Sequence, residues 1–182
     1  PATANSAVRS IAESALRASG GNPFVLVGHS SAGSYAYVAA GLLENTWGIR
    51  PEAVLLLDSV SIRHDDMEEI NFDRLMHRNF TADAESAVRM TNSRLSGMGR
   101  WMNLLGELDV QHPTSPVLIV RATREDFATT GAAAVVGDDP KSAAFPSAEI
   151  RTVDADHFSI VRDHAPQTAQ IVKDWLATLG QE

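Results

Sequence analysis

Residues 24–37 read FVLVGHSSAGSYAY and contain the turn that decides the fold. The apolar run 24–27 ends abruptly at Gly28, His29 and Ser30, and small and aromatic residues then continue to residue 43. This order predicts a buried strand over 24–27, a tight turn, and a helix over 31–43. In α/β sheets, reactive groups collect at the carboxyl ends of the strands, where helix N-termini present free backbone N–H groups. The turn therefore predicts a serine whose Oγ is exposed at that edge.

The residues around the turn decide which serine is the nucleophile. A serine on a tight strand-to-helix turn needs small residues two positions before and two positions after it, and Ser30 has Gly28 and Ala32 there. Counting from Ser31 would place the bulky His29 where the turn is tightest. We therefore favour Ser30 as the nucleophile, with the backbone N–H of Ser31 facing the oxyanion. The alternative is an ordinary strand-to-helix connection in which Ser30 caps the helix.

The rest of the chain alternates helix and strand patterns. The predicted elements are an amphipathic helix over 6–18, strands over 54–57, 116–120 and 148–153, and a final helix that opens at Pro166 and whose inner face is Ile171, Val172, Trp175, Leu176 and Leu179. Such alternation predicts parallel strands joined by right-handed crossovers. We expect residues 1–182 to belong to a single α/β domain.

Composition excludes several classes of function. The chain has 182 residues, 15 basic and 23 acidic, for a net charge of −8, and no Lys/Arg cluster that would attract nucleic acid or anionic lipid. It has no apolar run long enough for a membrane span, and its first residues do not form a signal peptide. The absence of cysteine excludes disulfides and thiolate metal sites and is typical of a cytoplasmic protein. We predict no metal and no membrane partner.

A serine nucleophile needs a base, and the base needs an orienting acid. The chain has six histidines: His29, His64, His77, His112, His157 and His164. Only His157 directly follows a predicted strand and also comes after both the serine and a strand-end acid, the order found in hydrolases of this architecture. His164 is expected to be a surface or capping group. For the acid, Asp58 ends strand 54–57, but Asp126 and Glu125 follow strand 116–120, and order alone does not separate them.

Four segments carry a resemblance to a known family. They are PFVLVGHSSAGSYAYVAAGLLE (23–44), PEAVLLLDSVSI (51–62), SPVLIVRATRED (115–126) and DADHFSIVRDHAPQTAQIVKDWL (154–176). Together they resemble the terminal thioesterase domains of modular polyketide synthases, of the pikromycin and erythromycin type. The resemblance implies an α/β-hydrolase fold, a mostly parallel sheet with helices on both faces and a helical lid insertion. It also implies Ser30 as nucleophile, Asp58 as acid and His157 as base.

The resemblance further implies a reaction and its partners. Such domains accept a polyketide acyl chain from the phosphopantetheine arm of an acyl carrier domain and release it as a macrolactone or as an acid. No cofactor of the chain's own is expected. The alternatives are a stand-alone serine esterase or type II editing thioesterase with the same triad, and a catalytically silent fragment that packs against a partner.

Residues 62–112 are too long for a simple crossover and are predicted to form a lid over the site. All five methionines fall inside this segment. We consider six of its residues as a wall for an acyl chain, the alternative being that they fill the inner faces of thin helices: Met67, Met76, Met90, Met98, Trp101 and Met102. Residues 127–144 are predicted to be a mobile loop near the same edge.

Only one helix precedes the predicted strand 24–27, whereas the family has several strands there. The resemblance implies that this N-terminal part supplies a second oxyanion N–H and helices that form a homodimer. We therefore expect the chain to be the C-terminal two-thirds of its domain, with one edge of strand 24–27 unpaired.

Overall fold

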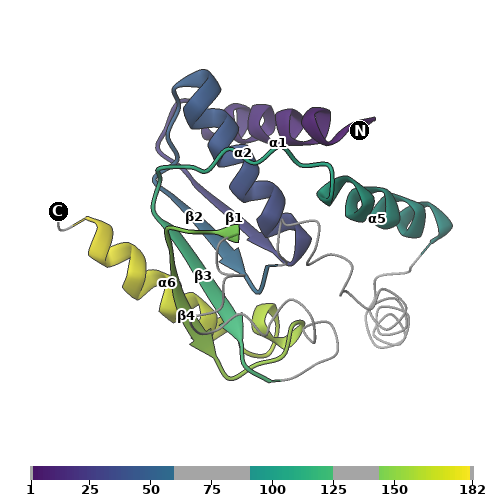
Figure 1. Ribbon diagram of the computed structural model, residues 1–182. Coiled ribbons are helices and arrows are strands. Elements are labelled where there is room, and N and C mark those ends of the chain that lie inside the picture. Colours follow the sequence, from purple (N-terminus) through teal and green to yellow (C-terminus); the bar gives the residue numbers. More distant parts are fainter. Residues whose placement is uncertain (1, 60–90, 125–143, 181–182) are drawn as a thin grey trace.

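The computed structural model describes residues 2–59, 91–124 and 144–180 (Figure 1). Its elements, in chain order, are α1 (Ala4–Ser19), β1 (Val25–His29), α2 (Ser31–Trp47), β2 (Ala53–Leu57), α5 (Asn92–Leu105), β3 (Val117–Ala122), β4 (Ala148–Val153), the 3-10 turn η2 (Ser159–Val161) and α6 (Ala165–Leu179).

The strands form one parallel sheet in the order β1-β2-β3-β4, with helices on both faces (Figure 1). Successive side chains of a strand point to opposite faces, and β2 is apolar on both. Val54 and Leu56 pack with α1 and α2, whereas Ala53 and Leu55 pack with α6. The predicted parallel α/β sheet, covered on both faces, is confirmed.

Most element boundaries differ from the predicted ones by one to four residues. Helix α1 begins at Ala4 rather than residue 6, because Thr3 forms a capping box with Ser6. Helix α2 continues to Trp47 rather than residue 43 and ends at Gly48, whose φ of 67° is the left-handed conformation of a helix end. Strand β1 extends to His29 because that residue still pairs with Leu57 of β2.

A carboxylate clamp ties the end of α2 to the segment before β3. Glu44 accepts hydrogen bonds from the backbone N–H and the hydroxyl groups of both Thr114 and Ser115. Burial raises the pKa of Glu44, but the hydrogen bonds from Ser115 and Thr114 outweigh burial, so its pKa is lowered overall. The clamp fixes the entry of the chain into the buried strand β3.

Several predictions fall on residues outside those that the structure describes. They are Met67, Met76, Met90, Glu125, Asp126, His64, His77, the part of the predicted lid before residue 91 and nearly all of the predicted loop 127–144. Of the predicted lid, the structure describes α5 and the segment to residue 112, with Leu104 and Leu105 buried against the core. Across the described ranges, every helix is too short or too polar to cross a membrane.

Candidate active site

Ser30 lies at the turn between β1 and α2 in a backbone conformation that residues with a Cβ rarely adopt. Its φ is 57° and its ψ is −134°. The turn is held by the N–H of Ser30, which donates to the carbonyl oxygen of Leu57 at 3.0 Å. Ser30 occupies the N-cap position of α2, but its side chain makes no capping hydrogen bond. The hydroxyl therefore does not serve the helix, and such backbone strain is concentrated at functional sites.

Two glycines let the strand and the helix approach each other at this turn. A Cβ at Gly28 would lie 2.4 Å from the backbone C and O of Ala32. A Cβ at Gly33 would lie 1.8 Å from Oγ of Ser59, which packs over the first turn of α2. The Cα of Gly33 lies at the same 2.4 Å from that position, so Gly28 packs directly against the backbone of both Ala32 and Gly33.

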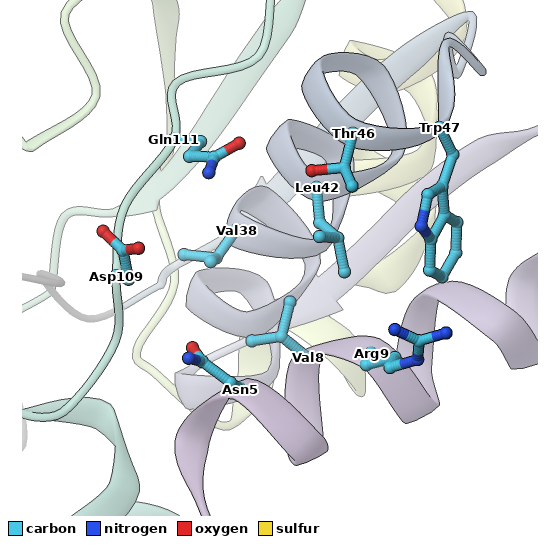
Figure 2. A pocket seen from close by; sticks show the side chains of 9 residues that line it. All are labelled: Asn5, Val8, Arg9, Val38, Leu42, Thr46, Trp47, Asp109 and Gln111. Carbon is cyan, nitrogen blue, oxygen red and sulfur yellow. The ribbon is translucent and has the colours of Figure 1, made fainter.

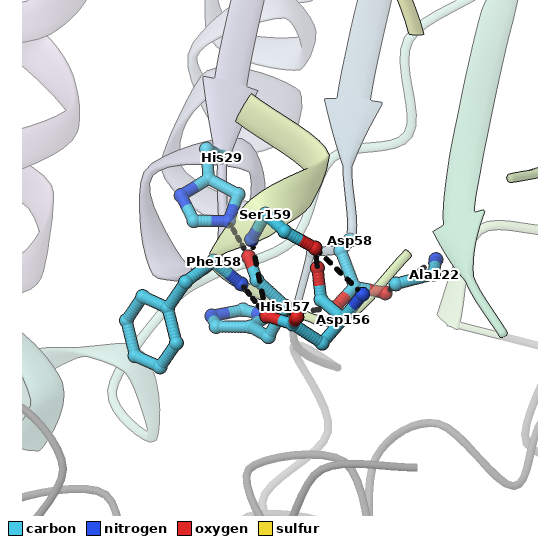
Figure 3. Close-up of polar contacts among 7 residues, drawn as sticks. All are labelled: His29, Asp58, Ala122, Asp156, His157, Phe158 and Ser159. Carbon is cyan, nitrogen blue, oxygen red and sulfur yellow. Dashed lines mark hydrogen bonds and ion pairs between the residues drawn. The ribbon is translucent and has the colours of Figure 1, made fainter. Parts of the chain in front are cut away.

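The structure brings Asp58 and His157 together at the same edge of the sheet (Figure 3). Nδ1 of His157 lies 2.7 Å from Oδ2 of Asp58, and both side chains are buried. The other carboxylate oxygen of Asp58, Oδ1, accepts the backbone N–H of Ala122 at 3.1 Å. Because a carboxylate only accepts, Nδ1 of His157 carries the proton, and Nε2 is left as the basic nitrogen of the neutral ring.

A short turn after β4 presents His157. Oδ1 of Asp156 accepts the backbone N–H groups of Phe158 and Ser159, each at 3.0 Å, while Oγ of Ser159 accepts the N–H of Asp156 at 3.0 Å (Figure 3). This reciprocal pair closes the turn around His157. The ring of Phe158 stands edge-on to the imidazole, with centroids 5.2 Å apart. The loop is therefore ordered by its own side chains.

Two further side chains beside this pair were not singled out from the sequence. His29, the last residue of β1, donates from Nε2 to the carbonyl oxygen of His157 at 2.7 Å. Arg121 is buried in β3, level with Asp58 because Leu57 pairs with Val120. Burial lowers the pKa of Arg121, and the charge of Asp58 partly opposes that effect. The position of His29 directly before Ser30 at a strand end was the sequence feature that could have identified it.

The other predicted site residues that the structure describes lie on α2 and α5. Ser31 is the first residue of α2, so its backbone N–H belongs to the helix N-terminus. Trp101 and Met102 pack against the core, and the ring of Trp101 meets that of Tyr35 edge-on at 4.9 Å. Met98 is half-buried on α5. The packing of Trp101 and Met102 favours the alternative in which they fill the inner face of a helix.

A surface cavity of about 240 Å³ lies elsewhere, at the other end of α2 (Figure 2). Its lining is Asn5, Val8, Arg9, Val38, Leu42, Thr46, Trp47, Asp109 and Gln111. At 1.5 Å of rise per residue, the α2 residues of this lining lie between about 10 Å (Val38) and about 24 Å (Trp47) along the helix from Ser31. Ser30 is not part of the lining. Within the described ranges, no three His, Asp or Glu side chains are grouped as a metal site would require.

Comparison with known proteins finds curated relatives among the polyketide synthases. No protein-family model matches the chain. It is 29% identical over 170 residues to erythronolide synthase EryA3 of Saccharopolyspora erythraea, covering 91% of this chain and 5% of that protein. It is 28% identical over 174 residues to polyketide synthase GfsE of Streptomyces halstedii, covering 93% of this chain and 4% of that protein. The chain thus spans about a twentieth of these curated relatives.

Among solved structures, the chain is similar to the NocB thioesterase domain in covalent complex with a fluorophosphonate nocardicin G analog. The TM-score is 0.63 at 18% identity, covering 96% of this chain and 75% of that one. This likeness, with the parallel sheet, confirms the predicted α/β-hydrolase fold. The resemblance to polyketide synthases noted in the sequence is confirmed by the two curated relatives.

Proposed function

We propose that this chain is a thioesterase that releases a polyketide acyl chain from an acyl carrier domain through an acyl-serine intermediate. The catalytic residues are Ser30, His157 and Asp58, with the backbone N–H of Ser31 as an oxyanion donor. The chain needs no cofactor of its own, because the phosphopantetheine arm belongs to the carrier domain.

The reaction has two halves. Oγ of Ser30 attacks the thioester carbonyl carbon while Nε2 of His157 accepts its proton, and the Ser31 N–H stabilises the oxyanion. Asp58 stabilises the imidazolium through Nδ1–H. The carrier thiolate then leaves and takes the proton from His157. In the second half, a hydroxyl of the acyl chain or a water molecule gives its proton to His157 and attacks the ester. The bond between the acyl carbon and Oγ of Ser30 then breaks, Oγ takes the proton back from His157, and the product is a macrolactone or a free acid.

The observation that carries this proposal is the buried hydrogen bond between Asp58 and His157, at the sheet edge where Ser30 sits in its strained turn. A buried carboxylate that accepts the Nδ1 proton of a histidine holds the ring in the tautomer that a general base requires. The substrate class is inferred from the similarity to erythronolide synthase and to a second polyketide synthase.

The free edge of β1 completes the proposal. Among the described strands, β1 pairs only with β2, and on the face of the sheet that carries α6 the side chain of Val27 is 56% exposed. We infer that a further strand pairs with this edge and that its segment supplies the second oxyanion donor and a dimer interface. On this proposal, residues 1–182 form the C-terminal two-thirds of one hydrolase domain, with 62–112 as its lid. A chain extended upstream should hydrolyse acyl-thioesters faster and stay monodisperse, whereas equal activity in residues 1–182 alone would refute this inference.

The test is covalent labelling followed by product analysis. A fluorophosphonate probe should modify Ser30, located by peptide mapping, and Ser30→Ala should not react. An adduct on Ser31 would move the turn by one residue, and no adduct at all would favour a catalytically silent protein. The protein that reacts with the probe is then assayed with a hydroxyacyl chain bound as a thioester to a carrier domain and, separately, to a small soluble thiol. Strong preference for the carrier thioester supports chain release, and preference for the small soluble thioester would support a stand-alone esterase.

A further inference from the structure

His29 forms a second polar contact to the loop that carries His157. Its Nε2 lies 2.7 Å from the carbonyl oxygen of His157, a residue 128 positions later in the chain (Figure 3). The two imidazole rings lie side by side, with centroids 4.7 Å apart and planes tilted by 34°. Because His29 immediately precedes Ser30, this contact joins the two ends of the proposed proton transfer.

The hydrogen bond fixes the tautomer of His29. A carbonyl oxygen only accepts, so Nε2 of His29 carries the proton. Burial lowers the pKa of His29, and the neighbouring His157 lowers it further, while the His157 carbonyl and the charge of Asp58 act in the opposite direction. His29 is thus held neutral beside a ring that becomes positively charged during acylation. A second positive charge at 4.7 Å would oppose that step.

We propose that His29 is a positioning residue that holds the main chain of His157 in register with Ser30 by donating from Nε2 to its carbonyl oxygen. This inference rests on the proposed function. The bond from Asp58 restrains the His157 ring through Nδ1, whereas the backbone of the loop is held by the Asp156 turn, by the N–H of Arg124 on the carbonyl oxygen of Ala155, and by the hydroxyl of Thr168 on that of Ile160. The His29 contact adds a restraint from the strand that carries the nucleophile. Misplacement of a reacting group by about 1 Å can cost about 10²-fold in rate.

A matched pair of variants separates this role from simple packing. In His29→Gln, the amide nitrogen takes the place of Nε2 and can still donate to the carbonyl oxygen. In His29→Asn, the amide nitrogen falls near the place of Nδ1 and cannot reach it. Both replacements are polar and neutral, so they differ chiefly in the reach of the donor.

The measurements are single-turnover acylation by an acyl-thioester and labelling by a fluorophosphonate, from pH 5 to pH 9, with the melting temperature of each protein. We expect His29→Asn to slow acylation by about 10²-fold with KM nearly unchanged, and His29→Gln to recover all but about threefold. The acid limb of the rate profile should keep its midpoint in His29→Gln, because the residue it replaces is already neutral.

Three results would overturn the inference: equal rates in His29→Asn and the unchanged protein, equal losses in both variants, or a raised acid-limb midpoint in His29→Gln. If His29→Asn does not fold, His29→Gln still tests the inference, because a loss of acylation rate near 10²-fold in that variant would refute the donor role. Thioester turnover by Ser30→Ala would instead refute the proposed function itself, whatever the His29 variants do.

Discussion

The replacement Asp58→Asn tests the proposed triad most sharply. The carboxylate of Asp58 uses both oxygens, Oδ2 for Nδ1–H of His157 at 2.7 Å and Oδ1 for the N–H of Ala122 at 3.1 Å. Asparagine has a single oxygen. If that oxygen stays with Ala122, the amide NH₂ faces Nδ1 of His157 and forces the proton to Nε2. Nε2 then cannot accept the proton of Ser30, and no negative charge stabilises the imidazolium.

Asparagine is also the least disruptive replacement for the backbone. Asp58 has a φ of 43°, and asparagine is among the few residues that adopt positive φ readily. A loss of activity with an unchanged melting temperature can therefore be assigned to the tautomer and the charge. The same replacement in a serine protease triad lowers kcat by about 10⁴-fold. That is about 5 kcal/mol of transition-state stabilisation.

The assay is steady-state release of thiol from an acyl-thioester, with the rate of fluorophosphonate labelling as a measure of the first step alone. We expect both rates to fall by about 10³–10⁴-fold in Asp58→Asn. The matched control is Asp154→Asn, since the Asp154 side chain is 78% exposed and pairs with Arg124 at the surface. A loss of less than tenfold in Asp58→Asn would refute the reasoning, and a larger loss in Asp126→Asn would place the acid after β3.

Three further predictions concern the turn at Ser30, the glycine before it and the Glu44 clamp. Ser30→Ala should abolish covalent labelling, while Ser31→Ala keeps its backbone N–H and should lose less than about tenfold in turnover; a reversed ranking would move the nucleophile to Ser31. Gly28→Ala places a Cβ 2.4 Å from backbone atoms, so it should stop labelling and lower the free energy of unfolding, measured by denaturant titration, by about 3 kcal/mol. The matched control is Gly97→Ala, whose Cβ has nothing within 4 Å and which should leave the free energy of unfolding unchanged or raise it. Because the folded-state pKa of Glu44 is lowered from 4.5, its carboxylate stabilises the fold above that pH and the effect is lost as pH falls through the folded-state value. Glu44→Gln should therefore lower the free energy of unfolding by about 1 kcal/mol at pH 7 and by less at pH 3. Urea titrations at the two pH values measure this, and equal losses at both would contradict the prediction.

The sequence was sufficient to predict the features that depend on residues close together in the chain. The strand, turn and helix around Ser30 follow from an apolar run and small residues, and Asp58 was placed correctly at the end of β2. The choice between Asp58 and Asp126 could not be made from order alone, because both follow buried strands. The contact from His29 could not be predicted either, since its acceptor is a backbone carbonyl 128 residues away and carries no side-chain pattern.

The sheet register explains why the nucleophile and the acid need no long loops to meet. His29 pairs with Leu57, and Leu57 pairs with Val120, so β1 and β2 end at one level and β3 continues two residues further, to Ala122. Ser30 and Asp58, the next residues, both have positive φ, which costs about 1–3 kcal/mol each for a residue with a Cβ. Hydrogen bonds across the sheet hold both: the N–H of Ser30 donates to Leu57, and that of Asp58 donates to Val120.

Asp58 and Ser30 differ in how far the surrounding strands enclose them. Asp58 is enclosed, because β2 has a neighbour on each side and the His157 turn covers its carboxylate. Ser30 follows β1, which has a described neighbour on one side only. Since a strand paired along both edges opens less readily than an edge strand, a further strand beside β1 would rigidify the nucleophile more than the acid–base pair. Its effect on turnover would therefore arise mainly in the acylation of Ser30, while the hydrogen bond between Asp58 and His157 forms without it.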